Sequence, residues 1–447
     1  MENSTKNVAV IGAGPAGASA AFYLQKKGFN VIVFEKAPFV GGRTHGFDNG
    51  KVKFDTGASF FTNFYPLLKD LVKELGIEEE VIELERRVGL KYKDVLAEFT
   101  FGSLKTFWNL PFITTKDKWI MIWNTLKLTL KRKQLDLVSP SKLAKFDDAS
   151  IADWATNDMS ENVYQYLIKP GVEPFWYFSC KDVSRAMTTV LQGRAADAKF
   201  YTFRNGMARI SEKLLEKCEL HLSTSVNNIK TSNNQIQIEY IENSQTQQIN
   251  VDYVVMATPA STTAELLNGK LEESSIGKFI KSQKYVHNIH SVYMMDEKDA
   301  KGLYAYYYPC GDWKTPIGAI VLHKLKCPDS VICPEGKELV SVFILDEPSK
   351  KLMAENNDEH IKNEIWKMAV DFVPEFPASA EHIALFKRKE AIPLHEVGRY
   401  KKANEIMDDK LGNIIFAGDY LTCATVEGAL RSGRWAAAKI TGEKISF

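Results

Sequence analysis

The chain has 447 residues, of which 45% are hydrophobic and 25% are charged, and its formal net charge is +1. This composition excludes a disordered chain, and the near-zero net charge gives no indication of nucleic-acid binding. A chain of this length is expected to form more than one ordinary domain.

The start of the chain carries the most informative pattern. Residues 8–11 (Val-Ala-Val-Ile) are typical of a buried strand and run directly into the sequence Gly12-Ala13-Gly14-Pro15-Ala16-Gly17. Gly12 can adopt the dihedral angles of a tight turn, Gly14 lets the backbone approach a pyrophosphate, and Gly17 lets a helix pack closely on its strand. The amides at the start of that helix would hold the phosphates. The alternative is a purely structural glycine turn.

An acidic residue follows at the expected distance. Glu35 ends the next apolar run, residues 31–34, and Lys36 comes directly after it. A carboxylate at the end of the second strand suits the two hydroxyls of a ribose, and it would repel the 2′-phosphate of NADP.

Further glycine-containing motifs separate a flavin from a nicotinamide cofactor. They are Gly41-Gly42-Arg43-Thr44, Phe54-Asp55-Thr56-Gly57-Ala58, Asp252 to Pro259, Asn413 to Tyr420, and Val426 to Gly433. At these residues the chain resembles the FAD-dependent amine oxidase superfamily, which includes monoamine oxidases, protoporphyrinogen oxidases and phytoene-type desaturases. The resemblance is strongest over about the first sixty and the last forty residues.

The resemblance implies an FAD site built from both ends of the chain. Arg43 would neutralise the pyrophosphate, Asp419 would accept hydrogen bonds from the ribityl hydroxyls, and Val226 would lie against the adenine. The alternatives are a surface arginine paired to Glu35 or Asp55, a turn or helix-cap aspartate, and an ordinary strand valine. The cofactor-binding candidates are Gly12, Gly14, Pro15, Ala16, Gly17, Glu35, Lys36, Gly42, Arg43, Gly57, Ala58, Val226, Gly418, Asp419, Glu427, Gly428 and Ala429.

The implied fold is of the α/β class. It combines a Rossmann-like, glutathione-reductase-like FAD-binding domain with an α+β substrate domain of mixed sheet and helices. We expect a discontinuous FAD domain over residues 1–85, 200–274 and 401–447, and a substrate domain over 86–199 and 275–400. Residues 86–199 are expected to be largely helical. Smaller expected elements are a helix over 209–217, strands over 235–240, 291–295 and 339–345, and a hairpin turn over 243–248.

The resemblance implies oxidation of the substrate by hydride transfer to flavin N5. Monoamine oxidases have an aromatic wall where this chain has Thr425, so we expect a bulky, apolar substrate of the protoporphyrinogen oxidase or desaturase type. Oxidation of a C–N bond and a redox-silent flavin scaffold are the alternatives. Residues 391–400 lack the cysteine that some members join to FAD, which favours non-covalent FAD. Oxygen or a quinone would accept the electrons.

The sequence alone assigns no catalytic residue. The pocket candidates are Thr425, Tyr400, Tyr306 and Lys324, with Lys326 as a second candidate for a lysine that reaches flavin N5 through water. A solvated lysine is the alternative. The aromatic runs at 175–178 and 304–308 would either line a cavity above the flavin or belong to the core.

Residues 105–133 mix tryptophan, leucine and isoleucine with six lysines or arginines beyond Lys105. Such an amphipathic helix either lies on an anionic membrane surface or packs its apolar stripe into the substrate domain. Six scattered cysteines without a CxxC pair, eight histidines without metal spacing and a polar start favour a cytoplasmic protein without a metal or disulfides.

Overall fold

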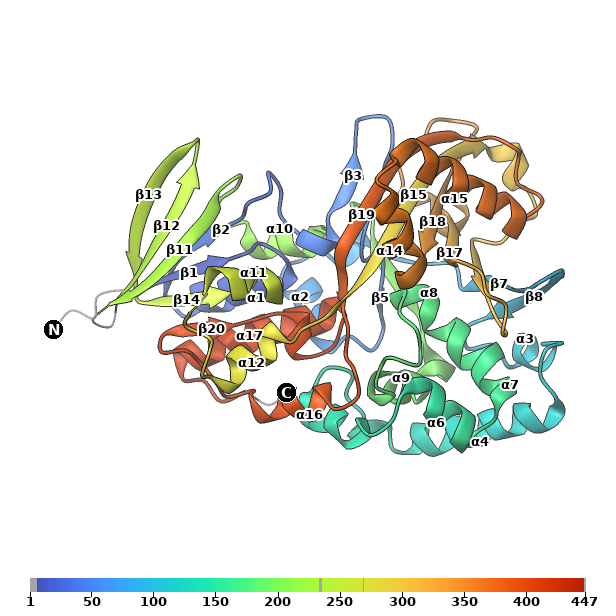
Figure 1. Cartoon of the computed structure of the whole chain (residues 1–447), viewed down its shortest axis with the longest axis horizontal. Coiled ribbons are helices and arrows are strands. Elements are labelled where there is room, and N and C mark those ends of the chain that lie inside the picture. The colour runs from blue at the N-terminus through green and yellow to red at the C-terminus, as the bar shows by residue number, and fades with distance from the viewer. Residues whose placement is uncertain (1–5, 233–234, 268, 446–447) are drawn as a thin grey trace.

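A five-stranded parallel sheet forms one end of the molecule, in the order β10-β2-β1-β14-β20. The computed structural model describes residues 6–232, 235–267 and 269–445, so the polar start at 1–5 lies outside it (Figure 1). The strands are β1 (Asn7–Ile11), β2 (Asn30–Phe34), β10 (Glu219–His221), β14 (Tyr253–Met256) and β20 (Ile414–Phe416). Their apolar runs are buried on both faces, as interior parallel strands require.

Two long helices pack together beside this sheet. They are α1 (Pro15–Lys26) and α17 (Val426–Thr441), from opposite ends of the chain. A Cβ on Gly433 of α17 would lie 2.0 Å from the carbonyl oxygen of Ala16 in α1. The two helices therefore approach closely only because this position has no side chain. Four further helices accompany the sheet, namely α2 (Pro66–Glu74), α10 (Arg209–Leu215), α11 (Ala260–Leu266) and α12 (Ser275–Lys281).

A small antiparallel sheet extends from this end and consists of β11 (Ser225–Ser232), β12 (Gln235–Glu242) and β13 (Gln245–Val251). The alternation expected over 235–240 is confirmed by the burial of every second residue of β12. The expected turn over 243–248 is too long. Asn243 and Ser244, both with positive φ, make the turn alone, because the following residues pair with β12.

A seven-stranded sheet forms the other end of the molecule, in the order β19-β15-β18-β17-β16-β7-β8. Its strands are β7 (Arg87–Tyr92), β8 (Val95–Thr100), β15 (Tyr285–Asp296), β16 (Tyr306–Pro309), β17 (Ile317–Leu322), β18 (Lys337–Ile344) and β19 (Glu381–Pro393). Helices α14 (Asp346–Glu355) and α15 (Asp358–Phe372) lie beside it (Figure 1). The expectation that 86–199 is largely helical is wrong at its start, because β7 and β8 form a hairpin that joins this sheet through β16.

A group of helices lies below the seven-stranded sheet in Figure 1. They are α3 (Leu104–Trp108), α4 (Thr115–Leu130), α5 (Pro140–Leu143), α6 (Ile151–Asp158), α7 (Glu161–Val163), α8 (Glu173–Trp176) and α9 (Ala186–Gln192). The amphipathic segment is thus two helices, because Thr114 and Asp117 form a capping box that starts α4 anew. No helix within the described ranges is long and apolar enough to cross a membrane.

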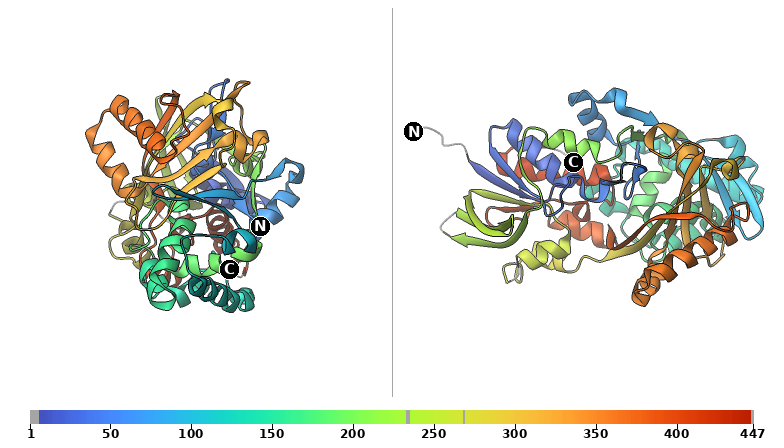
Figure 2. Two further views of the ribbon diagram at one scale, coloured as in Figure 1. Left: turned by 90° about the vertical axis from the view of Figure 1, so that its right-hand side faces the viewer. Right: turned by 90° about the horizontal axis from the view of Figure 1, so that it is seen from above.

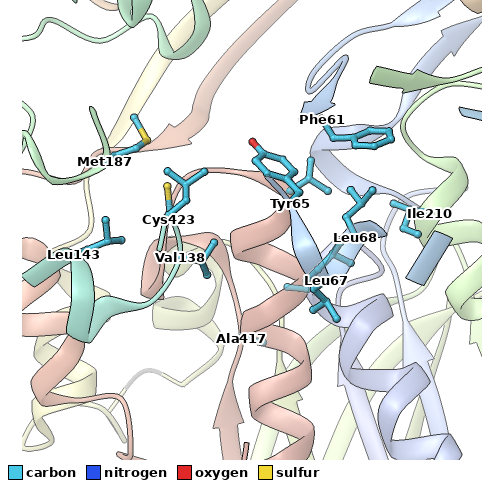
Figure 3. Packing of buried hydrophobic residues seen from close by; sticks show 14 of the residues in the cluster. Phe61, Tyr65, Leu67, Leu68, Val138, Leu143, Met187, Ile210, Ala417 and Cys423 are labelled. Carbon is cyan, nitrogen blue, oxygen red and sulfur yellow. The ribbon is translucent and has the colours of Figure 1, made fainter. Parts of the chain in front are cut away.

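Short elements join these parts of the molecule, which is elongated when seen from above (Figure 2). They are β3 (Gly46–Asp48), β4 (Lys53–Asp55), β5 (Phe61–Thr62), β6 (Val81–Glu83), β9 (Phe200–Phe203), α13 (His323–Lys326) and α16 (Arg399–Glu405). The core is continuous across this junction. Tyr65 and Leu68, at the start of α2, belong to the same buried cluster as Val138, Met187 and Cys423 (Figure 3).

Candidate functional site

The glycine loops of three motifs meet at the start of α1. Gly12 has φ of 105°, which favours glycine, and its amide donates to the Phe34 carbonyl oxygen at 2.8 Å. The Gly41 amide donates to the Ala13 carbonyl oxygen at 2.9 Å. A Cβ on Gly42 would lie 3.4 Å from the Cα of Gly14, whereas a Cβ on Gly14 itself would meet no atom within 4 Å. Open space therefore lies beside Gly14 at the N-terminus of the helix, and Pro15 and Ala16 are buried in its first turn.

Glu35 lies at the same turn. One oxygen of its half-buried carboxylate accepts a hydrogen bond from the Ala13 amide at 2.8 Å, and the other accepts from the Ala37 amide at 2.9 Å. Each oxygen keeps a further lone pair for a hydroxyl donor. Lys36 is exposed. Thr224, two residues before Val226, donates its amide to the Glu35 carbonyl oxygen at 2.9 Å, which brings half-buried Val226 near this acid.

Arg43 pairs with the other end of the chain. Its guanidinium lies 2.6 Å from the carboxylate of Asp419, and it also donates to the Ala391 carbonyl oxygen at 3.3 Å. The partner is therefore Asp419, and neither Glu35 nor Asp55. The Ala58 amide donates to the Arg43 carbonyl oxygen at 3.1 Å, and a Cβ on Gly57 would lie only 2.0 Å from that oxygen.

The start of α17 closes this region. Thr425 is the N-cap, and its hydroxyl accepts from the Gly428 amide at 3.0 Å. Gly418 donates its amide to Ser432, and Ala429 is half-hidden in the first turn of the helix. Glu427 is 1% exposed, and its carboxylate accepts from the amides of Leu67 and Leu68 at 3.0 and 2.9 Å. Its side chain thus caps α2, and burial raises the pKa of Glu427 to about 7.

This arrangement fits an extended dinucleotide. It offers open space at a helix N-terminus for phosphates, an acid with free lone pairs for ribose hydroxyls, and an Arg–Asp pair farther along. The candidates Gly12, Glu35, Arg43 and Gly57 lie within the first 57 residues, whereas Asp419 comes more than three hundred residues later.

An apolar cavity of about 520 Å³ lies between the helices and β7–β9. Its wall includes Phe60 and Tyr65 from the expected FAD domain and Phe175, Trp176 and Tyr308 from the expected substrate domain. The Trp176 indole donates to the Ala424 carbonyl oxygen at 2.9 Å, so the wall contacts the residue before Thr425. Each of the aromatic runs 175–178 and 304–308 lines the cavity only in part. Among the described residues of these runs, the lining ones are Phe175, Trp176 and Tyr308.

The pocket candidates lie elsewhere, since none of them is among the described residues that line this cavity. Tyr400 is buried and stacks on His395, with ring centroids 4.8 Å apart. Tyr306 is 6.0 Å from Tyr308 by ring centroids, and Lys324 pairs with Glu297. Lys326 is 5% exposed, and burial lowers its pKa.

Sequence reasoning missed a buried histidine pair. The Nε2 atoms of His290 and His323 both lie 2.7 Å from the hydroxyl of Ser341, and His290 Nδ1 lies 3.2 Å from the Thr56 carbonyl oxygen. Burial lowers the pKa of His323 to about 3 and that of His290 well below its usual value, so both rings are neutral. His290 Nδ1 must then donate to Thr56, and the Ser341 hydroxyl donates to His290 and accepts from His323. The spacing of 290, 323 and 341 gives no signal of this chain of bonds.

Comparison with known proteins agrees with these features. The profile of the family described as flavin containing amine oxidoreductase matches residues 15–441. Coproporphyrinogen III oxidase of Staphylococcus aureus is 22% identical, over 90% of this chain and 91% of that protein. A 1-hydroxycarotenoid 3,4-desaturase of Flavobacterium sp. is 42% identical, but over 17% of this chain and 15% of that protein.

The structure of cyclohexylamine oxidase from Brevibacterium oxydans is similar with a TM-score of 0.73 at 17% identity, over 98% of this chain and 99% of that one. At this identity the likeness shows the shared fold. The matched profile extends over nearly the whole chain. The chain therefore belongs to the flavin containing amine oxidoreductase family, and it is an FAD-dependent oxidoreductase.

Proposed function

We propose that this enzyme oxidises a bulky, mostly apolar molecule bound in the cavity beside Trp176. The cavity carries this proposal: its volume of about 520 Å³ is in the usual range for small-molecule sites, and aromatic and aliphatic side chains dominate its wall. Bound FAD supplies the redox chemistry by accepting a hydride at N5. The protein's share is to orient the substrate and to keep water away from it.

We propose that the cofactor is held by the residues gathered around α1 and α17. The amides following Gly12 and Gly14 would hold the pyrophosphate, and Glu35 would accept from the adenosine ribose. Arg43 and Asp419 would exchange part of their mutual pairing for contacts with the flavin portion. The side chain of Glu427 accepts hydrogen bonds from α2, so Glu427 and Gly428 would contact the flavin ring through their backbone atoms.

We further propose that α3 and α4 rest on an anionic membrane surface. Trp119, Trp123, Leu126 and Leu130 form one stripe along α4, and their exposed fractions are 60%, 58%, 45% and 78%. Exposed cations border this stripe, namely Lys105, Lys116, Lys127, Lys131, Arg132 and Lys133. Tryptophan with flanking lysine suits the boundary between lipid headgroups and acyl chains.

The same two helices connect this surface to the cavity. Leu104 is 74% exposed, and both Leu104 and Leu126 also line the cavity. An apolar substrate dissolved in lipid would therefore reach the cavity without crossing water.

The function is tested by mixing the FAD-loaded enzyme anaerobically with polyenes, porphyrinogens and small amines while following the flavin absorbance. We expect bleaching with a large apolar compound, followed by recovery on adding air or a quinone. Fast bleaching by benzylamine or putrescine, with no response to the large compounds, would instead assign the chain to amine oxidation.

A matched pair of variants ties the activity to the cavity. Ile120 and Ile122 are both half-buried residues of α4, but only Ile122 lines the cavity. Ile122→Trp should fill the cavity and abolish flavin reduction, whereas Ile120→Trp should retain it. Equal activity of the two variants would place the substrate elsewhere.

Membrane contact is tested by sedimentation with vesicles of phosphatidylcholine alone or mixed with phosphatidylglycerol. The wild type should bind the anionic vesicles, and the double variant Trp119→Ser, Trp123→Ser should lose most of this binding. Leu325, an exposed residue of α13, provides a control as Leu325→Ser. Equal binding of wild type and double variant would refute docking through α4.

A further inference from the structure

The wall of the cavity has an unusual chemical composition. Its 32 described lining residues include no aspartate, glutamate, lysine, arginine or histidine. A quarter of all residues in the chain are charged, so this absence differs sharply from the chain as a whole. Polar lining residues are present, but they are neutral: threonine, serine, tyrosine, tryptophan and glutamine.

Several charged residues on the surrounding elements bond to protein groups that do not line the cavity. On α4, Asp117 accepts from the Ser160 hydroxyl and Lys118 donates to the Trp108 carbonyl oxygen. Beside α8, Lys169 donates to the Gly311 carbonyl oxygen at 3.0 Å, and the Glu173 carboxylate accepts from the Cys180 amide at 3.0 Å.

Charged residues next to further segments of the wall are also bound to protein groups. Asp197, which lies between the lining residues Ala196 and Ala198, pairs with Arg132 at 3.8 Å, and Lys199 pairs with Glu83. Glu427, behind Tyr65, caps α2. A charged group on a bound molecule would therefore find no opposite charge in the wall, and an unpaired charge in an apolar site is strongly unfavourable.

One strip of the wall can form hydrogen bonds without charge. It lies between α4 and α9, where Gln192 donates from its amide nitrogen to the Thr125 hydroxyl at 3.3 Å. The amide oxygen of Gln192 and the hydroxyl of Thr188 are buried and have no hydrogen-bond partner among the residues that the structure describes. Residues 188 and 192 are one turn apart on α9, so a neutral alcohol that reaches this strip can donate to the amide oxygen or accept from the hydroxyl.

We infer that the buried substrate is electrically neutral: a long hydrocarbon, such as a polyene or an isoprenoid chain, with at most a hydroxyl or carbonyl group as its polar feature. This inference rests on the proposed function and narrows it. Porphyrinogens carry carboxylates and amines are cations at neutral pH, so both would bury an unpaired charge here. The neutral chain avoids that cost.

Three polyenes that differ only in their end group test this inference on the wild-type holoenzyme. Retinol is neutral, retinoic acid is anionic and retinylamine is cationic at neutral pH, and each quenches tryptophan fluorescence on binding near Trp176. Retinol should bind at least about thirtyfold more tightly than either charged analogue at pH 7, because a charged ligand must first be neutralised.

The pH dependence of binding gives a sharper signature. Retinoic acid should lose about tenfold in affinity for each pH unit above its pKa, whereas retinylamine should lose about tenfold for each pH unit below its own pKa, because only the neutral forms bind well. Retinol should change little, and it controls for titration of Glu427, whose pKa of about 7 lies in the range tested. Equal affinities for the three compounds, or parallel pH profiles, would overturn the inference.

A variant reverses the expected preference. Gln192→Lys places a cation in the neutral strip and should bring the affinity for retinoic acid to or above that for retinol, whereas Gln192→Leu should favour retinol less but leave retinoic acid weak. If Gln192→Lys does not fold, the affinity ratios of the three retinoids for the wild type and the pH dependence of those affinities still test the inference. If no retinoid binds and amines bleach the flavin, the proposed function itself fails. If charged and neutral retinoids bind alike, only the present inference fails.

Discussion

Glu427 allows a stability prediction that needs no substrate. Its carboxylate is 1% exposed, caps α2 through the amides of Leu67 and Leu68, and has its pKa raised by burial to about 7 from an ordinary 4.5. A carboxyl with a raised pKa holds its proton longer in the folded state than in the unfolded one. Its favourable contribution is therefore complete below about pH 4.5 and is lost as the pH rises towards and through about 7.

The size of this effect follows from the shift. Each pKa unit corresponds to about 1.36 kcal/mol, so ionisation of Glu427 removes roughly 3 kcal/mol of stability between about pH 4.5 and pH 8. Glu427→Gln keeps an acceptor for one α2 amide but cannot ionise. Relative to this variant, the wild type should become less stable by about 3 kcal/mol over that range. For 447 residues, at about 2.1 cal/mol/K of unfolding entropy per residue, this amounts to about 3 °C in Tm.

Differential scanning fluorimetry of both FAD-loaded proteins across this pH range measures the difference directly. Glu405→Gln, at an exposed position of α16, is the matched control and should leave the wild-type profile nearly unchanged. Parallel profiles for the wild type and Glu427→Gln would refute the argument, because they would mean that Glu427 does not change its protonation between these pH values in the folded protein.

Three further predictions concern the cofactor and the histidine pair. Acid precipitation of the yellow protein should release FAD into the supernatant, and colour retained in the pellet would contradict non-covalent binding. Glu35→Gln should keep the fold but weaken FAD affinity by about one to two decades in a flavin titration, since a charge-assisted hydrogen bond contributes about 1.5–3 kcal/mol; unchanged affinity would remove Glu35 from the site. Ser341→Ala should lower stability by about 1–3 kcal/mol, because it leaves His290 and His323 without their shared buried partner, and it should shift the imidazole nitrogen resonances of both rings; unshifted resonances would argue against the shared hydrogen bonds.

The parallel sheet could be predicted from the sequence because its strands and the turn after β1 are each indicated by a short run of neighbouring residues. Val8 to Ile11 and Val31 to Phe34 are buried strand runs, and Gly12 adopts the positive φ that its turn requires. The hairpin of β7 and β8 was not predicted, although Val88 and Leu90 are spaced as in a strand and are both buried. Its neighbour β16 lies more than two hundred residues later in the sequence, and no local sequence pattern predicts that β7 pairs with it.

The cofactor site could be predicted from the sequence and the substrate cavity could not, for a related physical reason. A pyrophosphate is recognised by backbone amides, so a short run of glycines is enough to indicate where it binds. A substrate cavity is made by side chains that only the tertiary structure brings together, here from the segments around Phe60, Phe101, Ile122, Phe175 and Tyr308. The same holds for Glu427: its motif suggested the cofactor, but a carboxylate binds the nearest unpaired donors, and these are the α2 amides. The cavity is neutral because no charged side chain is among its described lining residues. The sequence does not show this, because only the tertiary structure determines which residues form the wall.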